Sequence, residues 1–387
     1  MRGAAAVMAY DLAHTPKTGI RVQAGGDCHI MNFGAFATPE RNLIFDVNDF
    51  DETLPAPWEW DLKRLVASVS VAGLAAGFKV KDCEAAVHCA ARSYREHMAR
   101  FARMSPLEVW YQRIDFEPLV NQILKGAERR YTEKQIAKAR KQHFPLHIAP
   151  VIVGPNRGTT QLKIVENRPL IYHPAAEHHA VFADKVAHLI KRYRESLPVH
   201  LRVLFDGFEY CDMAMKVVGV GSVGTFCAVA LFATADREPL FLQLKEARPS
   251  VLERYVGANR YANNGERVVV GQRLMQAASD SFLGWTEGLD DHRHFYIRQL
   301  RDMKVSLVID TMNAAELGYY ADACARVLSR EHARSGDAAL IAGYLGSSQS
   351  FDDALASFAA DYARQTEIDH AALKKAVKTG QIRAEKV

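Results

Sequence analysis

The sequence predicts an α+β fold of two lobes with a helical C-terminal region, and three observations lead to this fold class. Acidic and amide side chains gather among short apolar runs between Gly25 and Asp61. A glycine-rich run at 217–225 precedes a strand-like run at 240–247. From Ala314 onward, apolar residues recur at helical spacing. The length allows two or three regions. We expect a larger region at 1–210, a small β-rich lobe at 211–305 and helices that pack on the larger region at 306–387.

The composition is that of an ordinary globular protein. Of the 387 residues, 49% are hydrophobic and 24% are charged. A formal net charge of +4 is too small to indicate nucleic-acid binding. The six cysteines include no Cys-x-x-Cys pair and the chain has no signal peptide, so we expect reduced thiols in a cytoplasmic protein. Residues 217–235 are uncharged, but their glycines argue against a membrane span.

The N-terminal half alternates short strands with helices. A strand at 20–24 follows a first helix and leads directly to Asp27. Residues 121–141 are strongly basic, which indicates a solvated helix face or, alternatively, a site for an acidic substrate. The other expected elements before residue 200 are helices at 4–13, 58–77, 81–103 and 178–197 and a strand at 42–47.

The most informative pattern is the spacing of three polar residues, Asp27, Asn32 and Asp46. Burying an unpaired acid among apolar residues is costly, and a divalent metal is a common partner. In kinases, an Asp takes the proton of the substrate hydroxyl, and an Asn five residues later and an Asp on the next hairpin hold magnesium. We therefore predict that Asp27 is the catalytic base and that Asn32 and Asp46 bind magnesium. Asp51 and Glu52 are expected in an exposed acidic turn.

The glycine-rich run supplies the second pattern. In kinases, such glycines close over the nucleotide phosphates, and a lysine on a later strand pairs with the phosphates and with a helix glutamate. Lys245 lies between apolar residues, where an unpaired ammonium is expensive. We predict that Glu266 orients Lys245, with Glu253 as the alternative. The predicted nucleotide-binding residues are Gly219, Gly221, Ser222, Gly224 and Lys245.

Three other interpretations of these motifs stay open. If residues 226–235 form a helix, then 217–246 is a βαβ unit, and Gly219–Gly224 is the dinucleotide fingerprint of an NAD(P)-binding oxidoreductase. Asp27 and His29 also match the first ligand pair of metal-dependent phosphoesterases, although the Gly-Asn-His-Asp motif of that class is missing. A non-catalytic module that binds nucleotide without turnover is the third.

The order of the motifs differs from that in ordinary kinases, where the glycine-rich loop and the lysine precede the catalytic aspartate. Here they follow Asp27 by about two hundred residues. A circular permutation would reconcile this order, because a site is defined by its geometry and not by chain order. Residues 310–334 would then form the helix that leads into the loop of Asp27. This hypothesis requires Asp27 and Asn32 to lie close to Lys245.

Several of these motifs resemble those of known kinases. Gly26-Asp27-x-His29-x-x-Asn32 resembles the catalytic loop of aminoglycoside phosphotransferases and choline kinases. Phe45-Asp46 resembles their metal-binding Ile-Asp, and Asp61-Leu62 resembles the helix start whose Asp braces that loop. The resemblance implies a protein-kinase-like fold with ATP and Mg²⁺ as cofactors.

Nearly end to end, the chain also resembles a bacterial family known as a domain of unknown function. The shared motifs are Arg2-Gly3-Ala4-Ala5, Gly26-Asp27-x-His29-x-x-Asn32-Phe33-Gly34, Phe45-Asp46-x-Asn48-Asp49-Phe50-Asp51-Glu52, Trp60-Asp61-x-Lys63-Arg64, Lys245-Glu246-Ala247, Gly271-Gln272-Arg273 and Arg298-Gln299-Leu300-Arg301-Asp302-Met303-Lys304. This family has no settled substrate. Its members usually carry further residues ahead of Arg2-Gly3, so the resemblance implies a short amino terminus here.

The remaining residues are expected to be helical, at 314–334, 338–345, 351–364 and 370–378. From all these patterns we predict an ATP- and Mg²⁺-dependent phosphotransferase that acts on an unknown hydroxylated acceptor, either a small molecule or a protein. We expect no nucleic-acid partner and no membrane partner.

Overall fold

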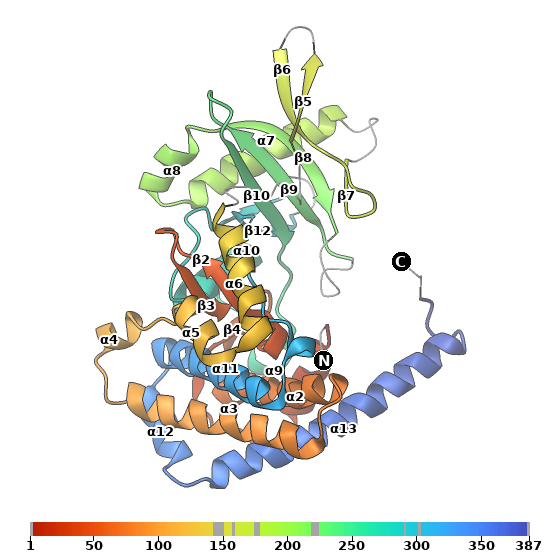
Figure 1. The fold of residues 1–387 in the computed structure, drawn as a ribbon. Helices are drawn as coiled ribbons and strands as arrows, with labels where there is room; N and C mark the ends of the chain where they lie inside the picture. The colour runs from red at the N-terminus through yellow and green to blue at the C-terminus, as the bar shows by residue number, and fades with distance from the viewer. Residues whose placement is uncertain are drawn as a thin grey trace.

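The protein is an α+β protein in which a six-stranded antiparallel sheet lies above a helical body (Figure 1). The computed structural model describes residues 3–141, 151–156, 159–173, 179–217, 224–289, 292–300 and 303–384. The helices of the body are α1 (Ala5–Ala13), α2 (Trp58–Ala75), α3 (Val80–Phe101), α4 (Pro106–Trp110), α5 (Phe116–Ile123), α6 (Gly126–Lys141), α11 (Ala314–Ser335), α12 (Ala338–Leu345) and α13 (Ser350–Lys378).

Two short antiparallel strand pairs sit on the body and carry the acidic stretch. β1 (Arg21–Ala24) pairs with β4 (Leu54–Pro57), and β2 (Phe33–Ala37) pairs with β3 (Leu43–Val47). All five residues of β3 are buried. A separate hairpin, β5 (Val151–Asn156) with β6 (Thr159–Ile164), lies beside the large sheet (Figure 1).

The large sheet has the strand order β11-β12-β10-β9-β8-β7, and every pairing in it is antiparallel. The strands are β7 (Ile171–Tyr172), β8 (Glu209–Lys216), β9 (Cys227–Ala233), β10 (Pro239–Glu246), β11 (Gly284–Glu287) and β12 (His294–Gln299). Because β9 is a strand that pairs with both β8 and β10, the βαβ unit considered from the sequence is not formed. That hypothesis failed because local alanine content favours a helix, whereas burial in a sheet decides the outcome.

The two faces of the large sheet differ, because side chains alternate along each strand. Leu240, Leu242 and Leu244 pack under α7 (His179–Ser196) and α8 (Val199–Phe205). Phe241 lies on the opposite face with Val229. α7 and α8 therefore pack with the sheet, although they precede residue 211, where the small lobe was expected to begin.

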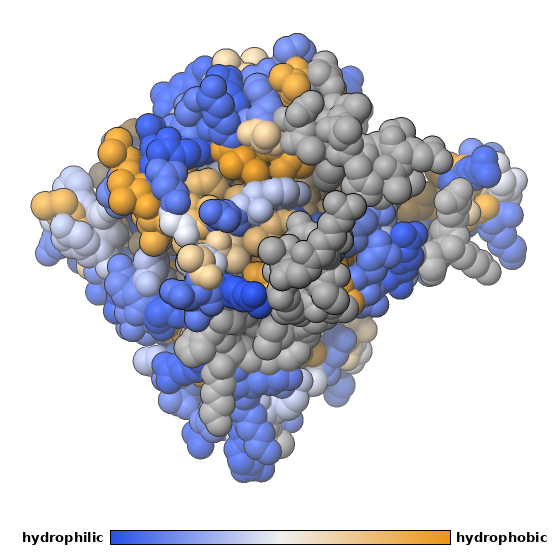
Figure 2. All heavy atoms as spheres, turned by 90° about the horizontal axis from the view of Figure 1, so that it is seen from above, coloured by the Kyte–Doolittle hydropathy of each residue, from blue (hydrophilic) through white to orange (hydrophobic). Residues whose placement is uncertain are grey.

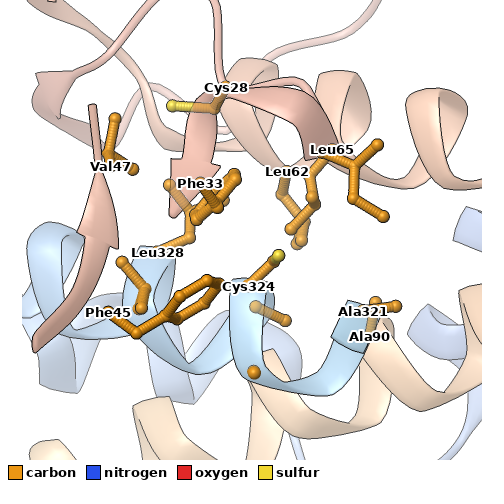
Figure 3. Packing of buried hydrophobic residues seen from close by; sticks show 14 of the residues in the cluster. Cys28, Phe33, Phe45, Val47, Leu62, Leu65, Ala90, Ala321, Cys324 and Leu328 are labelled. Atoms are coloured by element: carbon orange, nitrogen blue, oxygen red, sulfur yellow. The ribbon is translucent and has the colours of Figure 1, made fainter. Parts of the chain in front are cut away.

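The core of the body is organised around α11, which packs on α2 and α3. Figure 3 shows Phe33 and Phe45 of the β2–β3 pair and Leu62 of α2 facing Cys324 and Leu328 of α11. The α11 helix begins at a capping box, in which Asn313 and Glu316 satisfy each other's backbone N–H groups. The strands that carry the acidic stretch are therefore fixed by a fully buried apolar core.

The C-terminal region differs from the prediction in one respect. The two helices expected at 351–364 and 370–378 are one continuous helix, α13 (Ser350–Lys378). No glycine or proline interrupts these residues, so nothing ends the helix where the apolar pattern weakens. Its later turns are exposed and extend away from the body (Figure 1).

The surface seen from above is mostly hydrophilic, with apolar groups gathered in smaller areas (Figure 2). Val199 and Val203 of α8 are two exposed apolar residues of the described chain. Within the described residues, no helix combines the length and the apolar content that crossing a bilayer requires.

Candidate active site

Asp61, in the first turn of α2, binds the backbone of the loop that carries Asp27. The Asp61 carboxylate accepts hydrogen bonds from the backbone N–H groups of Gly25 (2.7 Å) and Gly26 (2.9 Å). Gly26 has φ +78°, a conformation that favours glycine. His332 of α11 lies between Asp61 (3.3 Å) and the hydroxyl of Tyr94 (2.6 Å). The bracing role expected for Asp61 is present in this geometry.

Asp27 itself lies in a polar contact network at the open side of this loop. Nε and one terminal nitrogen of Arg64 each lie 2.5 Å from Asp27 Oδ1, and His29 Nε2 lies 4.0 Å from Oδ2. Asn32 donates to the backbone carbonyl of Asp27 (2.7 Å), which ties the two predicted site residues together. Burial, opposed by Arg64, raises the pKa of Asp27 to about 7.

Asp46 is not on the open side of the site. Its side chain is completely buried, and Oδ1 lies 2.8 Å from a terminal nitrogen of Arg330 on α11. Oδ1 also accepts from Val47 N, and Oδ2 accepts from Ala277 N (2.9 Å each). These contacts join β3, α11 and the end of α10 (Asn264–Met275). This differs from the predicted magnesium role, because both oxygens of Asp46 already have protein partners.

The carboxylates that face Lys245 are Asp49 and Asp51. Lys245 Nζ forms an ion pair with Asp51 and lies 3.8 Å from Asp49 Oδ1. The side chains of Asp49 and Asp51 are 40% and 31% exposed, so they remain reachable from solvent. Burial opposes the charge of Lys245, but Asp49, Tyr296 and Asp51 raise its pKa well above the ordinary value. Lys245 is therefore a charged lysine with two carboxylate partners.

Asp49 also couples the lysine to the loop of Asp27. Burial would raise the pKa of Asp49, but Lys245, Arg298 and His29 act against it and the net direction is downward. Asp49 in turn acts on Asp27, where it raises the pKa. Asp27, Asp49 and Lys245 therefore belong to one electrostatic cluster, although Lys245 lies far away in the sequence.

Asp51 is held in place from two directions. The Tyr296 hydroxyl donates to Asp51 Oδ1 (2.8 Å), and buried Arg267 of α10 donates to the Asp51 carbonyl (2.7 Å) and to the Thr53 carbonyl (2.6 Å). Glu52 accepts from Val251 N (2.7 Å). Asp51 and Glu52 do lie in a turn, as predicted, but both are only partly exposed because distant parts of the chain contact them.

Glu266 is not an ion-pair partner of Lys245 in the described residues. It lies in the first turn of α10, where its N–H is capped by Asn263. The alternative, Glu253, accepts from Ser250 N (3.1 Å) and Asn259 Nδ2 (2.7 Å). The sequence placed a helix correctly after the lysine strand, but the acid that reaches Lys245 comes from the stretch near Asp27.

Three of the predicted nucleotide-binding residues, Gly219, Gly221 and Ser222, lie outside the described residues. Gly224 is described and has φ +82°, with open space where a Cβ would lie. Its carbonyl accepts from Arg248 (2.7 Å), and β9 begins three residues later. The described end of the glycine-rich run is thus the turn that enters the strand next to Lys245.

The sequence patterns did not single out Asp49 and Arg64, which contact Lys245 and Asp27 respectively. A signal for Arg64 was present, because it lies one helical turn after Asp61 and so shares its face of α2. For Asp49 the motif alone offered several acids without saying which one faces the lysine. No group of three or more His, Cys, Asp or Glu side chains arranged to hold a metal occurs in the part of the chain that the structure describes.

The site brings together the Asp27 carboxylate beside Arg64, the side-chain amide of Asn32, and the solvent-accessible carboxylates of Asp49 and Asp51. Carboxylate and amide oxygens are the ligands that Mg²⁺ prefers. In comparisons with known proteins, residues 1–376 match the family model described as "Uncharacterized protein conserved in bacteria (DUF2252)". No curated protein and no solved structure gives a match.

Proposed function

The chain belongs to the DUF2252 family of bacterial proteins, and from the geometry of its site we propose that it is an ATP- and Mg²⁺-dependent phosphotransferase with a circularly permuted, kinase-like arrangement. The observation that carries the proposal is the ion pair of Lys245 with the acidic stretch that follows the Asp27 loop. A lysine on a β-strand, beside a metal-binding acid and a catalytic Asp–Asn loop, is the constellation that kinases use for phosphoryl transfer.

The topology of the sheet supports the same proposal. The glycine-rich run lies between β8 and β9, Lys245 lies on the next strand β10, and α10 follows before β11. The end of α11 lies against β1, where Gln23 N donates to Ser335 Oγ (3.1 Å). That contact brings a helix end next to the strand that leads into the Asp27 loop, as the permutation requires.

The roles we propose follow the contacts. Asp27 accepts the proton of an acceptor hydroxyl, and Lys245 binds the phosphates of ATP. Asp49 and Asn32 hold Mg²⁺ in place of the predicted Asp46, and Asp51 orients Lys245 in place of Glu266. Bound Mg²⁺ would offset the negative charge of the phosphates during transfer. The acceptor is a hydroxylated molecule of undetermined class.

Thermal unfolding with ATP and Mg²⁺ together, with each alone, and with NAD tests the proposal, because a ligand that binds only the folded state raises the melting temperature. We expect a rise only with ATP and Mg²⁺ together, and its loss in Asp49→Asn. A rise with NAD and none with ATP would contradict the proposal.

A nucleotide-binding module without turnover is the second candidate. The observation in its favour is the Arg64 contact, because two guanidinium nitrogens occupy Asp27 Oδ1 and the charge of Arg64 opposes the rise in pKa that burial causes. The two candidates differ in one measurement, ATP consumption with a panel of hydroxylated acceptors. Turnover that Asp27→Asn abolishes favours the enzyme. Binding of ATP with no consumption favours the module.

A further inference from the structure

Lys245 is one of three cationic side chains on the same face of the large sheet, which is the face away from α7 and α8. In the sheet register, Cys227 of β9 lies opposite Lys245, and Lys245 lies opposite Tyr296 of β12. Lys216 ends β8, one residue beyond the Met215–Ala228 pair, which places it beside Cys227. Residues opposite one another in a sheet share a face. Arg298, two residues after Tyr296, shares it too and pairs with Gln243.

Lys216 and Arg298 differ from Lys245 in their partners. Among the described residues, only Lys245 of these three has a carboxylate within 4.0 Å. Arg298 donates to neutral oxygens, the Gln243 side chain (3.2 Å) and the Asn48 carbonyl (3.3 Å). Lys216 is half-buried, and burial lowers its pKa, with Cys227 and Arg298 as its charged or ionisable neighbours. A half-buried ammonium without an anion is costly, so its position favours a bound anion.

Among the residues that the structure describes, the charges on this face do not balance. The three cations Lys245, Lys216 and Arg298 face two carboxylates, Asp49 and Asp51, so one positive charge on this face is not offset. Lys216 and Lys245 lie two strands apart, which corresponds to roughly 10 Å at the usual strand spacing. One phosphate group is too small to contact both ends of such a row, whereas a chain of linked phosphates presents several charges along it.

We propose that Lys216 and Arg298, together with Lys245, form a polyphosphate-binding face. The inference rests on the proposed function for the role of Lys245 and adds the class of ligand, which is a molecule recognised through a chain of linked phosphates. Both a nucleoside triphosphate and inorganic polyphosphate carry such a chain. Lys216 and Arg298 are then binding residues that act beside the catalytic cluster and do not take part in proton transfer.

Isothermal titration calorimetry with Mg²⁺-tripolyphosphate, Mg²⁺-ATP and adenosine tests the proposal on the full chain. The variants are Lys216→Met, which keeps the apolar stem, Arg298→Gln, and both together. Lys191→Met is the control, because it removes the same charge from exposed α7 on the other side of the sheet. We expect tripolyphosphate to bind, adenosine not to bind, and each single variant to weaken both phosphate ligands about tenfold, the typical loss for a charged hydrogen bond.

Three results would overturn the proposal: equal affinity of the double variant and the wild type for tripolyphosphate, an equal loss in the Lys191→Met control, or binding of adenosine alone. Tighter binding of ATP than tripolyphosphate identifies a nucleotide, and equal binding identifies the inorganic chain. If Mg²⁺-ATP binding needs Asp49 but not Lys216 or Arg298, the proposed function stands and this inference fails. If tripolyphosphate binding needs the two cations but no phosphate is transferred, this inference stands and the phosphotransferase fails.

Discussion

Replacing Arg330 separates a structural role of Asp46 from a metal-binding one. Asp46 is completely buried and the Arg330 side chain is 3% exposed, so Arg330→Met leaves a buried carboxylate without its cation. Breaking a buried ion pair from one side costs about 3–5 kcal/mol. With an unfolding entropy of about 2.1 cal/mol/K per residue over 387 residues, a loss of about 4 kcal/mol lowers the melting temperature by about 5 °C.

The assay is chemical denaturation at pH 7, with and without Mg²⁺. We expect Arg330→Met to lose the same unfolding free energy in both conditions. The double variant with Arg330→Met and Asp46→Asn should lose less unfolding free energy than the sum of the two single variants. The control is Arg364→Met, which breaks an exposed pair with Asp361 and should cost under about 1 kcal/mol. A loss of unfolding free energy in Arg330→Met as small as that in the control would refute the reasoning. So would a Mg²⁺-dependent stability that disappears in Asp46→Asn and persists in Asp49→Asn.

Three further predictions concern the loop around Asp27, its contact with Asp61 and the packing of α10. The native pKa of Asp27 is about 7 against an ordinary 3.8, so its contribution to stability is complete below pH 3.8 and is lost as the pH rises through 7. Relative to Asp27→Asn, the wild type should lose up to about 4 kcal/mol between pH 4 and pH 8 in denaturant titrations, and parallel curves would contradict this. Asp61→Asn should destabilise by about 1–3 kcal/mol and speed hydrogen exchange at Gly25, because a buried charged acceptor is lost; unchanged exchange would argue against the brace. Gly271→Ala should destabilise by about 1–3 kcal/mol, since its Cβ would lie 2.4 Å from Thr53 Cγ2; a melting temperature equal to the wild type would contradict the close approach of α10.

Local patterns predicted most helices and the loop of Asp27. The α12 boundaries agree with the prediction, and α2, α7 and α11 agree within about two residues at each end, the usual uncertainty of helix limits. The apolar spacing and the capping residues that define these helices lie close together in the sequence, so a single sequence reveals them. The Asp27–Asn32 link was also predictable, because both residues lie in one short turn. The prediction for Gly219, Gly221 and Ser222 stays a prediction, because these three residues lie outside the described part of the chain.

The choice among the acids could not be made from spacing. Asp46 and Asp49 lie three residues apart, at the end of a strand that is buried on both faces, so alternation does not separate inside from outside. Which acid meets Lys245 depends on how the sheet lies on the body. Asp51 and Lys245 are 194 residues apart in the chain. Such a pairing follows from tertiary packing, which a single sequence does not display.

The error in α13 has a different cause. The helix was divided where apolar residues thin out, because a packed helix needs an apolar stripe. The later part of α13 does not pack on the body and is exposed, so its continuity depends on helix propensity alone. The alanine-rich sequence without glycine or proline was the available signal.

The long sequence separation of the buried pair has a consequence for biosynthesis. Asp46 is made 284 residues before Arg330, its cation. At about 5–20 residues per second on the ribosome, that interval is roughly 15 to 60 s. During it, the nascent acidic stretch has neither Arg330 nor the apolar face of α11 to pack on. We therefore expect the emerging N-terminal segment to expose unpacked apolar surface until α11 has been synthesised.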